Sequence, residues 1–154
     1  MASGYSRCDD IYVILESDRN RDFYPSNTGN NFKNYIQTPV PINSHYSVAI
    51  VDLLVPPMAQ QNTGSRLMKI KSNLTTTMVE NGPGSVLRAV AYDYKQPRGM
   101  AVTFTNPYYL RVCQDKVTSV SLEIEDEKGR PFQFDIGSGG VTLTLHFKKV
   151  GPQY

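Results

Sequence analysis

Apolar and polar residues alternate most regularly near the end of the chain, in the run Val141-Thr-Leu-Thr-Leu-His-Phe147. Successive side chains of a β-strand point to opposite faces, so this run predicts a strand with one apolar and one polar face. Such a strand covers one side of a hydrophobic core and shows its other side to water or to a partner. A second alternating run, Val117–Glu125, precedes it, and a tight turn at Gly129 and a glycine-rich connection join the two runs.

Further apolar or alternating runs predict the remaining strands. Ile11–Leu15 is apolar throughout and predicts a strand buried on both faces. Prolines end the next two strands, because proline cannot donate to a β-ladder. The window Arg88–Tyr94 comes nearest to an amphipathic helix, but it is too short for one. The predicted strands are residues 11–15, 32–38, 45–55, 66–71, 85–92, 100–105, 117–125 and 141–147, and residues 131–134 are a candidate for a further short strand.

This succession of strands and turns predicts the fold class. About eight strands with turn signals at short intervals are typical of a β-sandwich or barrel. Long loops after the first, third and fourth strands favour a jelly roll over a meander, because Greek keys need long crossings between sheets. We therefore predict an all-β protein, a single jelly-roll β-sandwich of about eight antiparallel strands. The domain is expected at residues 11–149, with a flexible N-terminal arm at 1–10 and a short C-terminal tail at 150–154.

The composition is consistent with this prediction and argues against several classes of protein. A chain of 154 residues forms one domain and folds without needing a metal or a disulfide. The net charge of +2 comes from well-mixed basic and acidic residues, so we expect no specific nucleic-acid binding. The N-terminal residues contain no apolar signal segment, and no apolar run approaches about 18 residues. We therefore expect synthesis in the cytoplasm and no membrane insertion.

Candidate metal ligands and nucleophiles are few. The histidines His45 and His146 form no His-x-His pair, which argues against a cupin-type metal site, and His146 is interpreted as a surface or interface residue. Cys8 and Cys113 are too far apart for a Cys-x-x-Cys site. Reduced thiols are the default expectation for both, and whether they meet stays open. Cys113 beside either histidine is a conceivable nucleophile, but no third group is positioned to orient it.

Two other groups of residues resemble catalytic motifs only in outline. The carboxylates of Glu123, Glu125 and Asp126-Glu127 follow from alternation on an exposed strand that runs into a turn. The segment Gly137-Ser138-Gly139-Gly140 precedes a strand and lacks the lysine of a phosphate-binding loop, so it is interpreted as a connection between strands. We therefore predict that the chain is not an enzyme. It has no assigned catalytic, cofactor-binding or metal-binding residue, and we expect no cofactor.

Tyrosine is frequent, with ten residues, while tryptophan is absent. At strand ends and in loops a tyrosine buries its ring while its hydroxyl finds a polar partner. Such tyrosines suit both protein contact surfaces and the corners of a sandwich, and the composition does not separate the two. They are Tyr5, Tyr12, Tyr24, Tyr35, Tyr46, Tyr92, Tyr94, Tyr108, Tyr109 and Tyr154.

Several sequence blocks follow one another in a characteristic order. An N-terminal strand leads to an Asn-rich loop, a Pro-Ile step leads into the third strand, and the chain ends with a turn and an alternating strand. The blocks are Phe23–Thr28 with Asn31-Phe32, then Pro41-Ile42 with Tyr46–Pro56, and finally Glu123–Phe132 with Val141–Lys148, of which the final pair is the most specific.

In this order the blocks resemble the penton (minor capsid) proteins of Polinton/Maverick-type elements and the related adintoviruses. The resemblance covers roughly residues 11–149. It implies a single jelly roll that forms homopentamers, which close the five-fold vertices of an icosahedral shell built from a double-jelly-roll major capsid protein. The expected location is then the virion capsid. The arm at 1–10 and the tail at 149–154 become candidates for holding neighbouring subunits.

A second hypothesis belongs to a different class of protein. A jelly-roll recognition module would bind a glycan or a host surface protein through its loops, here Ser17–Asn31 and Met58–Ser65. Sites of this kind usually need a calcium cage or an exposed aromatic side chain over the sugar. Tyr24 and Asp22 supply only part of such a site.

Overall fold

A computed structural model gives the structure of the chain and describes residues 10–19, 22, 24–38, 41–59, 67–75, 85–92, 98–135 and 139–150. Within these residues every regular element is a β-strand. The strands in chain order are β1 (Asp10–Glu16), β2 (Asn31–Tyr35), β3 (Tyr46–Val55), β4 (Leu67–Ser72), β5 (Ser85–Ala91), β6 (Met100–Thr103), β7 (Leu110–Arg111), β8 (Ser119–Glu125) and β9 (Thr142–Lys149).

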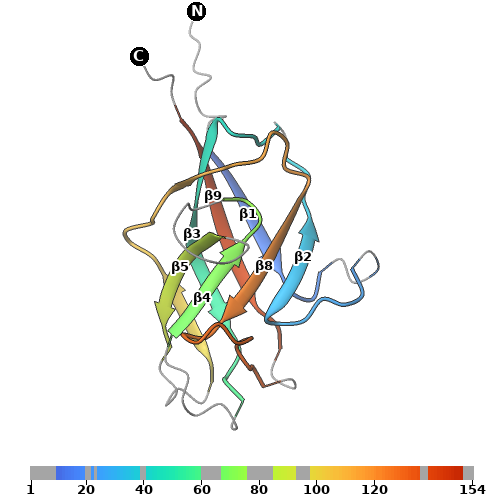
Figure 1. Ribbon diagram of the computed structural model, residues 1–154, viewed down its shortest axis with the longest axis vertical. Coiled ribbons are helices and arrows are strands. Elements are labelled where there is room, and N and C mark those ends of the chain that lie inside the picture. Colours follow the sequence, from blue (N-terminus) through green and yellow to red (C-terminus); the bar gives the residue numbers. More distant parts are fainter. Residues whose placement is uncertain are drawn as a thin grey trace, which may run out of the picture.

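The strands form two antiparallel sheets that face each other (Figure 1). Sheet A has the order β1-β9-β3-β6, with β7 also pairing with β3, and sheet B has the order β2-β8-β4-β5. The pairing is nested along the chain: β1 with β9, β2 with β8, β3 with β6 and β7, and β4 with β5. This long ribbon is coiled so that β9 also meets β3 and β8 also meets β4, which is a jelly roll. The predicted fold class is confirmed.

The core lies between the two sheets and follows the alternation of the strands. On β9 the predicted inward residues, Leu143, Leu145 and Phe147, are all buried. On sheet B the matching residues are Phe32 from β2 and Leu122 from β8. The loop after β8 adds Phe132, whose ring lies 5.2 Å from that of Tyr92, centroid to centroid. The alternating runs therefore predicted correctly which side of each strand is covered.

Two predictions about single strands are wrong. The strand at Ile11–Leu15 is not buried on both faces, because β1 is an edge strand whose outward residues Tyr12 and Ile14 are 64% and 50% exposed. The candidate strand at 131–134 consists only of isolated bridges, from Pro131 to Glu125 and from Phe134 to Met58. The short strand β7 carries no alternating run and was not predicted.

The connection between β8 and β9 begins with the predicted tight turn. Gly129 has a positive φ of 80°, and its N–H donates to the carbonyl of Asp126 at 3.0 Å. The two strands that it helps to join lie in opposite sheets. At the ends of the chain, Asp10 already belongs to β1, and residues 1–9 and 151–154 lie outside the described part. In the described part no helix is long and apolar enough to cross a membrane.

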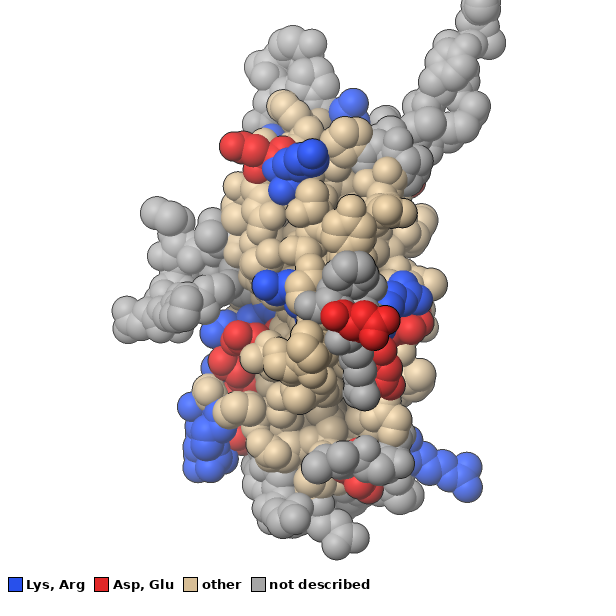
Figure 2. Space-filling model, turned by 90° about the vertical axis from the view of Figure 1, so that its right-hand side faces the viewer, with Lys and Arg blue, Asp and Glu red and all other residues tan. Residues whose placement is uncertain are grey.

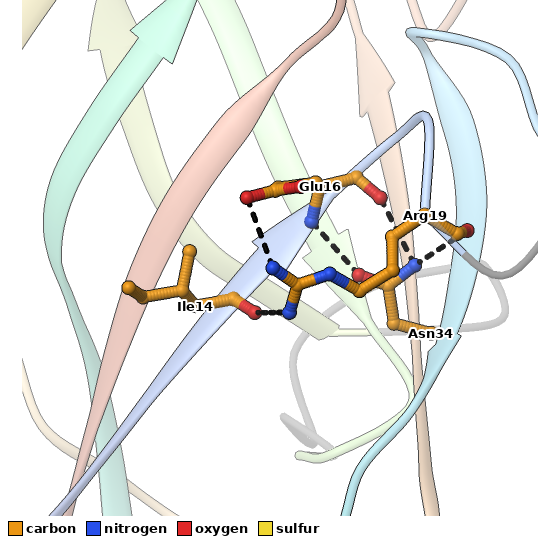
Figure 3. A network of polar contacts seen from close by, with 4 residues as sticks. All are labelled: Ile14, Glu16, Arg19 and Asn34. Carbon is orange, nitrogen blue, oxygen red and sulfur yellow. Dashed lines mark hydrogen bonds and ion pairs between the residues drawn. The ribbon is translucent and has the colours of Figure 1, made fainter.

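β1 and β2 are edge strands of different sheets and lie on the same side of the sandwich. There, side chains bond to the backbone of β1 and link the two sheets (Figure 3). The Asn34 amide accepts from the N–H of Glu16 at 2.8 Å and donates to its carbonyl at 3.0 Å, as a neighbouring strand would. Arg19 donates to the carbonyl of Ile14 at 3.1 Å and to the carboxylate of Glu16 at 3.0 Å. These bonds satisfy the backbone of an edge strand that would otherwise be open to pairing.

Candidate functional site

The outer face of sheet A carries most of the exposed large apolar side chains of the described residues. Besides Tyr12 and Ile14 on β1, it includes Leu54 on β3, which is 52% exposed. The register places Thr144 between Ile14 and β3, and Thr142 directly between β1 and Leu54. The same register places the carboxylates of Asp52 and Glu16 beside these threonines, so the middle of this face carries aliphatic, threonine and acidic side chains.

His146 organises one end of this face. Its ring stacks on Tyr12, with centroids 4.4 Å apart and planes 9° apart, and it meets the Tyr109 ring edge-on at 5.6 Å. Its Nδ1 lies 2.7 Å from the Tyr109 hydroxyl, and its Nε2 lies 3.0 Å from the Asp10 carboxylate. We call the surface formed by Tyr12, Ile14, Leu54, Tyr109 and His146 the Tyr12 face. His146 lies on the outer side of β9, as predicted, but the two tyrosines cover it so that only 8% of it is exposed.

The proton positions in this cluster follow from its chemistry. A carboxylate only accepts, so Nε2 of His146 donates to Asp10. In a neutral ring Nδ1 is then an acceptor, and the hydroxyl of Tyr109 donates to it. Burial raises the pKa of Tyr109, and the neighbouring Tyr12 and Asp10 raise it further, which keeps the hydroxyl protonated. A tyrosine in this state is a poor nucleophile, so the cluster is suited to holding aromatic rings in place for a contact.

The outer face of sheet B has a different character. Lys69 and Lys71 on β4 stand opposite Glu125 and Glu123 on β8, and the Lys71 ammonium lies 3.3 Å from the Glu125 carboxylate. Figure 2 looks onto the side between the two sheets, on which β2 lies in Figure 1, and there groups of both charges lie around an uncharged area. Sheet B thus presents the mixed charge of an ordinary solvated surface, unlike the Tyr12 face.

A cleft of about 460 Å³ opens at the end of the sandwich where β1 leads into β2 and β8 leads into β9. One wall comes from the β1–β2 loop, with Ser17, Asp18 and residues 27–30, and the other from residues 133–135 and 139–140. Both loops of the recognition hypothesis reach this region, because Met58 bridges to Phe134, although residues 60–65 lie outside the described part.

The polar groups of the cleft are amides and carboxylates. The amide of Asn27 is used within the loop, on the backbone of Lys33, and that of Asn30 donates to the carbonyl of Phe132 at 2.9 Å. Asp18 and Asp135 supply its carboxylates. Among the described residues no three His, Cys, Asp or Glu side chains come together in a way that could hold a metal ion. The wall chemistry fits hydrogen bonding to a neutral ligand rich in hydroxyl groups.

The candidate nucleophile Cys113 is exposed, and the structure records it as a free thiol. Its Sγ lies 3.9 Å from the carbonyl of Asn73, and neither histidine is among its recorded contacts within the described residues. His45 is exposed in a turn, and both ring nitrogens of His146 are already bonded. Cys8 lies outside the described part of the chain. Within the described part of the chain, no hydrogen bond from a base reaches Cys113.

The carboxylates and the glycine segment behave as structural features. Glu123 and Glu125 lie on the outer face of sheet B, while Asp126 is buried and holds the turn that follows. The carboxylate of Glu127 accepts from the N–H of Leu67 at 3.2 Å. Gly139 and Gly140 line the cleft and lead into β9, as predicted for a connection, while residues 137–138 lie outside the described part.

The described tyrosines are divided between buried and exposed positions, and one of the buried ones has the corner role. Tyr46 and Tyr92 are buried, and the hydroxyl of Tyr92 accepts from the N–H of Met58 at 2.8 Å, so it fastens a corner. Tyr12, Tyr35, Tyr108 and Tyr109 are exposed. Tyr24 lies beside Lys33, whose ammonium is 5.6 Å from the ring centroid, and Asp22 is exposed in the same loop. Tyr5, Tyr94 and Tyr154 lie outside the described residues.

Comparison with known proteins adds no relative. No protein-family model matches the chain, and no curated protein matches it.

The Tyr12 face was not predicted as a site from the sequence. Alternation placed His146 on the outer side of its strand, but the apolar run that contains Tyr12 was predicted to be buried on both faces. Only the register of β1 against β9 places the two residues opposite each other.

Proposed function

We propose that the chain is a structural viral capsid protein, a penton-type minor capsid subunit whose homopentamers close the five-fold vertices of an icosahedral shell. The observation that carries the proposal is the Tyr12 face, where aromatic and aliphatic side chains are exposed together, on a sandwich whose other outer face carries paired lysines and glutamates. Large apolar patches exposed on soluble proteins mark interaction sites. The centres of protein interfaces are depleted of charge and enriched in tyrosine. The sequence resemblance and the jelly-roll topology support the same role.

In a closed ring each subunit uses two different surfaces, one toward each neighbour. We assign the Tyr12 face to one side of this contact. His146 holds Tyr12 by stacking and Tyr109 by a hydrogen bond, so these side chains lose little freedom when a neighbour covers them.

The further partner in this role is the double-jelly-roll major capsid protein, and the location is the virion. Asp10 and Lys148 pair where the described chain begins and ends, at one end of the sandwich (Figure 1). The segments before Asp10 and after Val150 are therefore attached close together. We propose that they hold neighbouring subunits, so that a chain without residues 1–9 folds normally but enters shells less efficiently.

Native mass spectrometry of the purified chain at several concentrations and salts tests the proposal. The expected species has five times the 17.3 kDa mass of one chain. Because the shell itself could template the ring, a second measurement is co-assembly with the major capsid protein. A chain that stays monomeric at every concentration and is also left out of shells contradicts the proposal.

The cleft favours a second candidate function, a recognition module for a glycan or a host surface protein. Its walls bring the β1–β2 loop against the half-buried ring of Phe134, in a volume that a sugar unit fills. A glycan array probed with the monomer tests this candidate. Binding that Phe134→Ala removes supports it, and an array without signal counts against the glycan.

A further inference from the structure

The two open sides of the sandwich are closed by different means. Between β1 and β2, the Asn34 amide satisfies backbone groups of the edge strand. On the β5 and β6 side, the link is Arg88, which reaches from β5 to the loop after β6. Its guanidinium carbon lies 4.1 Å from the centroid of the Phe104 ring, and its Nη1 donates to the carbonyl of Asn106 at 3.1 Å. Among the described residues, no side chain bonds to the backbone of β5 in the way that Asn34 bonds to β1.

A groove of about 360 Å³ runs along this second side. Its first wall is residues 86–89, consecutive positions of β5, and its second wall is Asn106 and Tyr108. β5 pairs with β4 and with no other described strand, so it is an edge of sheet B. An edge strand presents a row of N–H and C=O groups to a further strand. Tyr108, 63% exposed, provides an aromatic surface beside them.

Arg88 gives the groove a positive charge in a fixed position. Within the described residues it makes one hydrogen bond and one ring contact, and no ion pair is recorded for it. A guanidinium has five N–H donors, so most of them remain for a ligand. Its stacking on Phe104 orients the group before anything binds, and a planar guanidinium fits a carboxylate with two parallel hydrogen bonds.

We propose that this groove binds an extended peptide segment of a partner protein, which adds a strand to the β5 edge of sheet B and places an Asp or Glu side chain on Arg88. Backbone hydrogen bonds supply the affinity in this mode, and contacts of alternate side chains supply the specificity. The guanidinium of Arg88 beside this edge favours a partner segment with an acidic side chain at this position. The site does not depend on the pentamer.

A library of random nine-residue peptides, displayed on phage and selected on the full-length chain, tests the proposal. We expect enriched peptides with an acidic residue at a constant position. Replacing that residue by its amide, or Arg88→Gln in the protein, weakens binding about tenfold or more, and the two changes together cost little beyond either alone. No enrichment, or equal binding to the Arg88→Gln protein, overturns the proposal.

N-methylation of the peptide tests strand addition without touching the protein. Methyl groups on the amides of one edge block pairing with β5 and abolish binding, while methyl groups on the opposite edge leave it intact. Equal effects of both edges overturn the strand-addition mode. The variant Lys33→Gln on β2 serves as a charge-matched control and leaves binding unchanged. A peptide of residues 1–9 that binds more tightly than the selected peptides overturns the assignment to a different protein.

Discussion

The imidazole ring of His146 lies parallel to the phenol ring of Tyr12, with the two centroids 4.4 Å apart. The residues stand directly opposite each other on β9 and β1. The ring of His146 cannot turn without breaking its bonds to Asp10 and Tyr109. This one side chain therefore joins the beginning of β1, the end of β9 and the segment before β7 on the outside of the sandwich.

We expect His146→Ala to lower the free energy of unfolding by about 2 kcal/mol, because it removes the stack and leaves Asp10 and Tyr109 without their hydrogen-bond partner. Urea denaturation followed by circular dichroism measures the loss. Thr144→Ala, two residues earlier on the same face of β9, is the control and should change stability by less than about 0.5 kcal/mol. Equal losses in both variants would show that the cluster adds nothing specific.

The double variant Ile14→Ser and Leu54→Ser tests the Tyr12 face as a contact surface. Both side chains are about half exposed, so the fold of the monomer should keep its stability within about 1 kcal/mol. If the face joins subunits, the double variant shifts the native mass from the pentamer to the monomer. Lys69→Ser on the outer face of sheet B is the matched control. A pentamer that survives the double variant would place the contact on another surface.

Asn34→Ala should open the side between β1 and β2. It removes the acceptor for the N–H of Glu16 and the donor for its carbonyl, at a cost of about 2 kcal/mol. Asn34→Asp retains the acceptor but turns a buried carboxylate oxygen toward the carbonyls of Glu16, Arg19 and Lys33, so we expect a loss at least as large. Hydrogen exchange at the amide of Glu16 provides a local readout, which should become faster in the alanine variant, and an unchanged rate would contradict this role of Asn34.

Gly99 and Gly129 illustrate two different reasons why a position requires glycine. Both have positive φ, but a Cβ on Gly99 would lie 2.3 Å from the carbonyl oxygen of Val55, while a Cβ on Gly129 would meet nothing within 4 Å. Gly129→Ala should therefore cost about 1 kcal/mol for its backbone conformation. Gly99→Ala should cost about 3 kcal/mol, because the backbone after β3 must also move. Thermal unfolding of the two variants, compared side by side, checks the difference.

Asp126 should make the chain sensitive to acid. Burial raises the pKa of this carboxyl, but the N–H groups of Arg130 and Lys128 and the guanidinium of Arg130 outweigh it, and the pKa falls below its ordinary value of 3.8. The folded pKa is depressed, so the stabilisation is present above pH 3.8 and is lost as the pH falls through the folded value.

Asp126→Asn lacks this contribution and should be less stable at pH 7 by about 2 kcal/mol. The difference in unfolding free energy between the wild type and this variant should shrink as the pH falls below 3.8. Urea titrations from pH 7 to acid measure it, with the exposed Asp115→Asn as the control. A difference that stays constant with pH would contradict the role of the ionised carboxylate.

Local patterns predicted most of the strands because inward and outward positions alternate along a single strand. Leu143, Leu145 and Phe147 of β9 are the clearest case. The same reasoning failed on β1, because an apolar run has the same sequence pattern whether both faces of the strand are covered or only one. It also missed β7, since two residues paired with Ser47 and Val48 are too short for any period.

What the sequence alone determined is the class of the fold and the covered side of its strands, because alternation and turn residues act over a few neighbouring positions. Tertiary structure decided the rest. It placed Tyr12 against His146, Asn34 against Glu16 and Arg88 against Phe104, all pairs that are distant in the chain. Such contacts depend on strand register and on the coiling of the ribbon, and a shift of one residue would turn each side chain to the opposite face.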